Sequence, residues 1–221
     1  GVQTTGGNAA IEITLTAGDL TLQDDITANG SGTVTLAVLG AGSALITGDT
    51  NDDIASTSGA ISITADTLTL ATDATIESDG ALTLQPNATD RSVGVSGGAG
   101  SFALSTAEID LLTDGFSLIT IGRSDSTALM TINADTFEDP ITFLMGGVSG
   151  DITTAGALVT SNLAMTFTAG TGNSGVFTQG DGSSTIATGS GNITVNADTI
   201  ALSTTANTVT TTGAITLQPN T

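Results

Sequence analysis

The residues of this 221-residue chain that could do chemistry are carboxylates and hydroxyls, because the sequence contains no His, no Cys and no Lys. It therefore offers no Ser-His or Cys-His nucleophile pair, no Schiff-base lysine and no ordinary zinc site. Adjacent acids occur at Asp24-Asp25, Asp52-Asp53 and Glu138-Asp139. Paired carboxylates act as general acid and base in glycan cleavage, so these pairs are the candidates for catalysis.

The surroundings of these pairs argue against an enzyme. Adjacent residues on a strand face opposite ways, so each pair would have to lie in a turn to act together. The chain has no Trp or Tyr to form a sugar platform, and its only basic side chains are Arg91 and Arg123. We therefore expect no enzymatic activity, with a glycan-active β-helix enzyme as a remote alternative.

Calcium is a second chemistry that the acids could support. The stretch Asp49, Asn51, Asp52 and Asp53 offers hard oxygen ligands, and its three carboxylates are the candidate metal ligands. Neither the EF-hand spacing nor the calcium-binding nonapeptide repeat is present. Structural calcium is thus an alternative to acids that simply keep the turns solvated, and we expect no other cofactor.

The charge and hydropathy of the chain argue against nucleic-acid binding and against a membrane-spanning segment. The net charge of −20 repels nucleic acid, which is bound through Lys and Arg. No apolar run approaches the roughly 18 residues of a membrane span. The opening residues lack a basic region followed by an apolar one, so we expect no signal peptide and interpret the chain as a mature segment cut from a longer protein.

The composition predicts an all-β chain with a narrow core. Hydrophobic residues make up 38% of the sequence but aromatic residues only 3%, so Ala, Val, Leu and Ile must fill the interior. Thr, Val and Ile favour strands, while Gly and Asp favour turns. The mean hydropathy of +0.30 argues against disorder despite the high charge.

A long internal repeat points to the architecture. The segment 59–87, which begins GAISITADTLTL and ends LQPN, recurs at 191–220 as GNITVNADTIAL and LQPN. Leu84 and Leu217 within it lie 133 positions apart. The second copy implies that the chain is assembled from a structural module.

A shorter period lies inside the module. Apolar-x-apolar pairs follow turns at Ile11/Ile13, Val34/Leu36, Ile61/Ile63, Leu82/Leu84, Ile193/Val195 and Ile215/Leu217. Repetition of alternating strands every 20–27 residues predicts a parallel β-helix, or β-solenoid, whose rungs stack on one another. Connections between parallel strands are nearly always right-handed, so we expect that hand.

The middle of the chain departs from this rhythm. We divide the chain into rungs at 1–89, a stretch with an excursion at 90–150, and rungs at 151–221. Ser105 and Glu108 form a capping-box pattern that predicts a short helix over 105–112. Four of the six Phe residues lie nearby, at 102, 116, 137 and 143, and are expected to pack this excursion.

The runs SGAISITADTLTL, DGALTLQPN and FALSTAEIDLLTDGFSLITIGRSDS resemble the repeats of large secreted bacterial exoproteins of the filamentous haemagglutinin type. The resemblance covers most of the chain. It implies a right-handed parallel β-helix, export by two-partner secretion or autotransport, and a role in adhesion, aggregation or a surface fibre. The secretion domain of that family has no counterpart here.

These observations predict a structural segment of an extracellular or cell-surface bacterial fibre. Its expected partners are further copies of the same repeat or chain, together with host-surface or matrix glycans. An alternative is an ice- or mineral-binding face made of Thr-x-Thr pairs, which occur at 14–16, 33–35, 67–69, 166–168 and 208–210.

Overall fold

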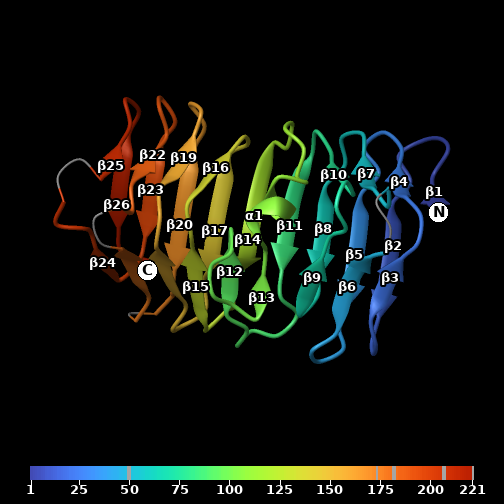
Figure 1. The fold of residues 1–221 in the computed structure, drawn as a ribbon, viewed down its shortest axis with the longest axis horizontal. Coiled ribbons are helices and arrows are strands. Elements are labelled where there is room, and N and C mark those ends of the chain that lie inside the picture. Colours follow the sequence, from blue (N-terminus) through green and yellow to red (C-terminus); the bar gives the residue numbers. More distant parts are fainter. Residues whose placement is uncertain (49–50, 173, 181–182, 206–207, 221) are drawn as a thin grey trace. The chain divides into compact units, whose positions relative to one another are not determined.

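A computed structural model describes residues 1–48, 51–172, 174–180, 183–205 and 208–220 (Figure 1). Nearly all regular structure in these ranges is short parallel β-strand. The chain divides into two compact units: Gly1–Ala88 with Thr106–Thr120, and Thr89–Ser105 with Ile121–Thr221.

Three sheets of parallel strands enclose the core of the first unit. One contains β1 (Val2–Gln3), β4 (Ile26–Ala28), β7 (Ile54–Ser56) and β10 (Ile76–Glu77). A second contains β2 (Ile11–Leu15), β5 (Val34–Val38), β8 (Ile61–Thr64) and β11 (Ala81–Gln85). The third contains β3 (Leu20–Leu22), β6 (Ala44–Thr47) and β9 (Thr67–Thr69). β14 (Leu118–Arg123) begins in this unit.

The second unit repeats this plan. One sheet contains β17 (Ile141–Met145), β20 (Met165–Ala169), β23 (Ile193–Asn196) and β26 (Ile215–Gln218). Another contains β12 (Val93–Val95), β13 (Phe102–Ala103), β15 (Leu129–Ile132), β18 (Asp151–Thr154), β21 (Val176–Gln179) and β24 (Thr199–Ala201). The last contains β16 (Asp135–Phe137), β19 (Leu158–Thr160), β22 (Ile186–Ala187) and β25 (Val209–Thr210).

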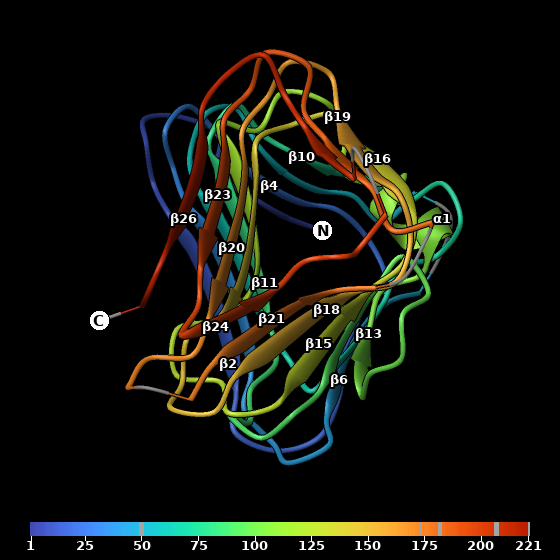
Figure 2. The same ribbon diagram turned by 90° about the vertical axis from the view of Figure 1, so that its left-hand side faces the viewer.

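The second unit coils in the right-handed sense. Seen end-on in Figure 2, its strands lie on three sides, with β20, β23 and β26 on the left, β18, β21 and β24 below, and β16 and β19 on the right. The chain visits these sides counter-clockwise as it approaches the viewer. The predicted right-handed parallel β-solenoid is therefore confirmed.

The strand register confirms the short period. Ile11 pairs with Val34, Val34 with Ile61 and Ile61 with Leu82, so the apolar-x-apolar pairs of the first unit form one ladder. Alternate residues are buried, as the period of two requires. Rungs are 21 residues apart at Ile61 and Leu82 and 28 apart at Met165 and Ile193, close to the predicted 20–27.

The excursion is smaller than predicted. α1 comprises only Thr106–Ile109, one turn within the expected 105–112. It ends early because the following residues join the first unit as an extra rung: Leu112 bridges Ile76 in parallel, and the Ile76 amide donates to the Leu111 carbonyl. Within the stretch 90–150, residues 106–120 pack with the first unit, and residues 90–105 and 121–150 pack with the second.

Two of the four Phe residues expected at the excursion, Phe137 and Phe143, pack elsewhere. Phe137, Phe143, Phe167 and Phe177 form a chain of ring contacts in the core of the second unit, with ring centroids 5.5, 5.3 and 5.0 Å apart. Rungs in register place aromatic residues above one another, and offset rings pack well at this separation. The interior of the second unit therefore holds four aromatic rings, and two of them, Phe143 and Phe167, stack in register on adjacent rungs.

Candidate functional site

The acids in the turns bind the backbone of neighbouring rungs. Asp25 Oδ1 accepts the amide of Asp53 at 3.1 Å. Asp53 Oδ1 in turn accepts both the amide and the hydroxyl of Thr75, at 2.7 and 2.8 Å. Each of these residues directly precedes an Ile that starts a strand, Ile26, Ile54 or Ile76, so the acids form a column along the corner of the first unit.

Other polar turn residues act in the same way, each accepting a backbone amide about one rung away. The pairs are Asp19 with Ala44, Asp66 with Gly42 and Ala88, Asp151 with Val176, Asp198 with Gly175, Asn8 with Ser31, Asn162 with Ser190 and Asn192 with Ala214. Sequence reasoning missed this role, because the partners lie 22 to 28 positions away with no local signal between them.

Two of the three predicted metal ligands, Asp52 and Asp53, face different neighbours. Asp49 lies outside the described residues. Asp52 is buried with its carboxylate toward Gly48, whereas Asp53 faces Thr75. Within the described ranges no three acids gather in a group that could hold a metal ion. Asp53 therefore joins two rungs through its bonds to Thr75.

The adjacent acid pairs are also split. Asp24 accepts the N-terminal ammonium at 2.6 Å, while Asp25 binds Asp53 on the next rung. Glu138 is exposed and Asp139 is buried, so this pair does not face a common space. The two carboxylates of each pair therefore do not aim at a common substrate position.

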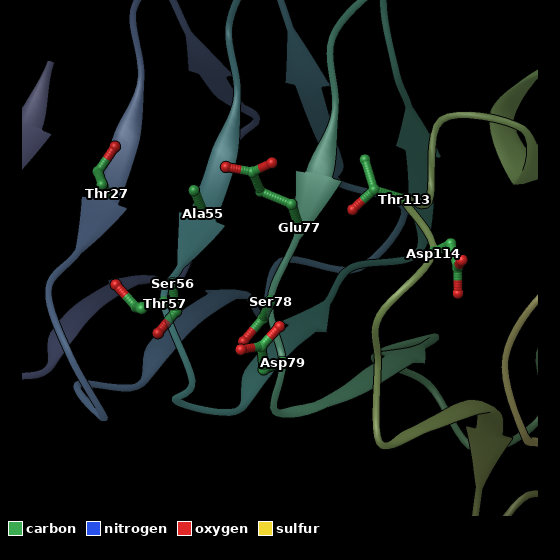
Figure 3. Close-up of a pocket in the computed structure, with 9 residues that line it drawn as sticks. All are labelled: Thr27, Ala55, Ser56, Thr57, Glu77, Ser78, Asp79, Thr113 and Asp114. Carbon is green, nitrogen blue, oxygen red and sulfur yellow. The ribbon is translucent and has the colours of Figure 1, made fainter.

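A pocket of about 370 Å³ lies in the first unit, beside the sheet of β4, β7 and β10 (Figure 3). Its lining is polar and comprises Thr27, Ala55, Ser56, Thr57, Glu77, Ser78, Asp79, Thr113 and Asp114. The hydroxyls of Ser56 and Ser78 are already committed, donating to the carbonyls of Gly32 and Gly59 at 2.7 Å each. The chain contains no His or Lys, so the carboxylates of Glu77, Asp79 and Asp114 are the groups in this lining that could act as a base.

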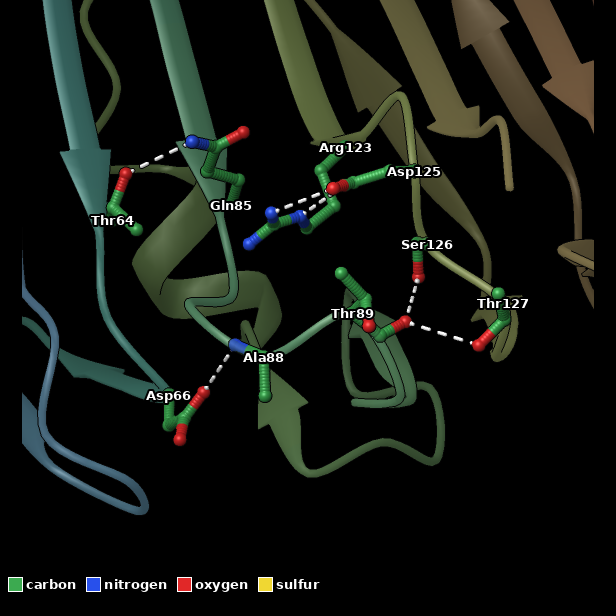
Figure 4. A network of polar contacts seen from close by, with 9 residues as sticks. All are labelled: Thr64, Asp66, Gln85, Ala88, Thr89, Arg123, Asp125, Ser126 and Thr127. Atoms are coloured by element: carbon green, nitrogen blue, oxygen red, sulfur yellow. Dashed lines mark hydrogen bonds and ion pairs between the residues drawn. The ribbon is translucent and has the colours of Figure 1, made fainter.

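Figure 4 shows polar contacts from both units. In the first, Gln85 donates to Thr64 at 3.0 Å and Asp66 accepts the Ala88 amide at 2.9 Å. In the second, the Arg123 guanidinium donates to Asp125 at 3.0 Å. This hydrogen bond holds the pKa of the Asp125 carboxyl below its ordinary value.

The Thr-x-Thr pairs do not form a common array. The pair at 67–69 lies in β9, that at 166–168 in β20, and that at 208–210 reaches into β25, which belong to three different sheets. A different set of Thr residues does align. Thr142, Thr166, Thr194 and Thr216 are in register on successive strands of the second unit, with half-buried or exposed side chains.

Both terminal rungs expose apolar side chains. At the C-terminal rung, Ile215 and Leu217 in β26 are each 46% exposed, and Leu202 is 42% exposed. At the N-terminal rung, Val2 is 44% exposed and lines a hollow of about 400 Å³ with Ile13 and Leu20. Among the described residues, β2 and β26 are edge strands of their sheet.

The chain matches no family model, and comparisons with curated proteins and with solved structures find no similar protein. In the described ranges no helix is long and apolar enough to cross a membrane. The stacked rungs and the acids at their corners are therefore the features of the molecule that bear on its function.

Proposed function

We propose that this chain is a structural repeat segment of an extracellular or cell-surface bacterial fibre or adhesin. It builds a rod or filament and promotes adhesion or self-association. The segments that resemble filamentous haemagglutinin repeats lie on these rungs. The proposed extracellular or cell-surface location is taken from that resemblance. Further copies of the repeat and surface glycans are the proposed partners.

The main support for the proposal is that both copies of the module make the same hydrogen bonds at one corner of the solenoid. Ser78 Oγ donates to the Gly59 carbonyl at 2.7 Å and accepts the Gly80 amide at 2.9 Å. In the second copy Thr211 Oγ1 donates to the Gly191 carbonyl at 2.6 Å and accepts the Gly213 amide at 2.8 Å. A chain that repeats a stacking device is suited to extension along one axis.

The distribution of polar groups supports the same role. The chain contains 22 acidic and two basic side chains, which gives a net charge of −20. Asp25, Asp53 and Asp66 accept backbone amides, and the described residues contain no group of three acids that could hold a metal ion. Such a surface keeps an elongated molecule soluble while its interior stays apolar. A fibre segment needs these properties, whereas a catalytic site would need convergent groups.

The experiment is surface display. Bacterial cells that display the chain should aggregate and adhere to glycan-coated surfaces more than cells that display a compact β-protein of equal size. Negative-stain images of the isolated chain should show rods or filaments. Compact particles, or display without a change in aggregation and adhesion, would contradict the proposal.

The Thr column favours a second candidate function, binding to an ice or mineral surface. Parallel strands place Thr142, Thr166, Thr194 and Thr216 at a regular spacing of about 4.8 Å. The test is Thr194→Val, which keeps the shape and removes one hydroxyl. A fall in ice-recrystallisation inhibition or mineral binding, relative to the unchanged chain, would support this function, and inactivity of both would exclude it.

A further inference from the structure

The turn that follows β4 contains the sequence Asn29-Gly30, the one place in the chain where an asparagine precedes a glycine. The side chain of Asn29 is exposed. The Gly32 amide donates to the Asn29 carbonyl at 3.1 Å, which closes the turn before β5 begins at Val34. An asparagine carboxamide and the next backbone nitrogen can close a five-membered ring, so this turn presents a reactive pair of groups at the surface.

The geometry of the turn requires glycine at position 30. Gly30 has a φ of 62°, in the left-handed region that most residues with a side chain avoid. A Cβ added to Gly30 would clash with Oδ1 of Asn8, on the preceding rung. Because glycine has no side chain, nothing on residue 30 shields its nitrogen from the Asn29 carboxamide. The residue that permits the turn is therefore also the one that leaves this nitrogen most open to reaction.

Hydrogen bonds tie the backbone of this turn to the rungs on either side. On the preceding rung, Thr4 Oγ1 accepts the Asn29 amide at 2.8 Å. On the following rung, the Ser58 amide donates to the Gly30 carbonyl at 2.9 Å. The Gly30 amide makes a longer bond, to Thr57 Oγ1 at 3.3 Å. The main chain is therefore held between two rungs, and the group that must react is the one held by the longest of these bonds.

We propose that Asn29 is a site of spontaneous modification, at which deamidation replaces asparagine with aspartate and isoaspartate. The Gly30 nitrogen attacks Cγ of Asn29, and a new C–N bond forms. The Gly30 amide proton passes through water to the leaving nitrogen, ammonia departs, and a succinimide ring remains. Water then opens the ring. Addition at Cγ gives aspartate, and addition at the backbone carbonyl gives isoaspartate, in which the main chain runs through Cβ and Cγ.

The two products differ in their effect on the turn. Aspartate keeps the length of the main chain and adds one negative charge to a chain that carries −20. Isoaspartate inserts one more carbon atom between the Asn29 amide, which Thr4 accepts, and the Gly30 carbonyl, which accepts Ser58. The pairing of β4 with β7 fixes the separation of the rungs, so the longer chain must give up one of these bonds. Isoaspartate should therefore loosen this corner of the first unit, independently of the proposed fibre function.

Peptide mapping tests the reaction. The folded chain is aged in mildly alkaline buffer at physiological temperature, digested with endoproteinase Asp-N and analysed by mass spectrometry. This protease cuts before aspartate but not before asparagine or isoaspartate, so the three forms of residue 29 are distinguished. Conversion at Asn29 should exceed conversion at Asn8, which precedes Ala9 and whose Oδ1 accepts the Ser31 amide at 3.1 Å. Conversion in the urea-unfolded chain but not in the folded chain would overturn the proposal.

Thermal melts test the effect on the turn. The aged chain should melt at a lower temperature than Asn29→Asp, which carries the same added charge on a main chain of ordinary length. Asn29→Gln is the control for other damage during ageing, because its longer side chain would have to close a larger ring; its melting temperature should not change with age. An aged chain that melts with Asn29→Asp would contradict the loosening of the corner. An equal loss of stability in aged Asn29→Gln would overturn the assignment to Asn29.

Discussion

The rings of Phe143 and Phe167 stack in register on adjacent rungs, with centroids 5.3 Å apart and an interplanar angle of 23°. Both side chains are fully buried, and Phe167 also contacts Phe177 at 5.0 Å. A ring at this position therefore joins two rungs and two sheets.

Replacing Phe167 with Ala should lower the free energy of unfolding by about 3–5 kcal/mol, because the change removes ring contacts and leaves a cavity. Val148→Ala, at a 62% exposed position, should change it by less than about 0.5 kcal/mol. Urea denaturation followed by circular dichroism measures both. Equal effects of the two substitutions would mean that the ring stack does not stabilise the rungs.

The corner glycines permit close stacking of rungs. A Cβ added to Gly59 would lie 2.0 Å from the carbonyl oxygen of Gly32, one rung away. Gly59→Ala should therefore destabilise the chain by about 1–3 kcal/mol through overpacking. Gly6→Ala is the control, since a Cβ there meets nothing within 4 Å. Thermal melts of both variants check the expectation, which fails if Gly59→Ala melts with the control.

The acid column makes a separate contribution. Asp53 accepts two hydrogen bonds from Thr75, so Asp53→Ala leaves the Thr75 amide and hydroxyl without this acceptor. Hydrogen bonds to a charged group are worth about 1.5–3 kcal/mol, and the loss of stability should lie in this range. Asp110→Ala removes the same charge at an exposed position and should have little effect. A similar loss in both variants would assign the effect to net charge.

The ion pair of the second unit predicts a pH response. The Arg123 hydrogen bond lowers the pKa of Asp125, so its stabilisation is present above the ordinary carboxyl pKa and is lost as pH falls through the lowered value. Arg123→Gln should raise the pKa of Asp125 toward its ordinary value. Carbon-detected NMR titration of the carboxyl group measures this, and an unchanged pKa would remove Arg123 as the cause. The effect on stability should be small because Asp125 is 59% exposed.

Local patterns predicted the fold where apolar residues recur at strict spacing. Ile61/Ile63 and Leu82/Leu84 fall in register as expected. The sequence pattern did not predict the rungs that begin at Ile141 and Met165. Their apolar-x-apolar pairs contain Phe and Met, and they lie in or beside the irregular stretch 90–150. The helix was overestimated, since a capping pattern marks a helix start but cannot show that Leu112 is needed as a bridge to Ile76.

The hydrogen-bond partners of the polar residues could not be predicted from the sequence. Turn acids were expected to be solvated, yet Asp52 and Asp66 are buried and Asp151 begins a strand. The partner of each polar residue depends on which residue of the next rung lies beside it. Asp66 illustrates this: its carboxylate is fully buried and accepts amides from Gly42 and Ala88, on two different rungs. Such contacts follow from the exact length of each rung, which varies along the chain.

If the proposed fibre segments associate laterally, their charge should make that association depend on ions. Chains that each carry −20 repel one another at low salt, and millimolar divalent cations should reduce this repulsion and promote bundling. Because the acids of the described ranges form no group of three, calcium and magnesium should act equally, as diffuse counterions rather than as ligands of a built site. Light scattering with each cation, and with sodium chloride at matched ionic strength, measures the response. A response to calcium alone would point instead to a selective oxygen cage, and no response to either cation would mean that bundling does not depend on charge.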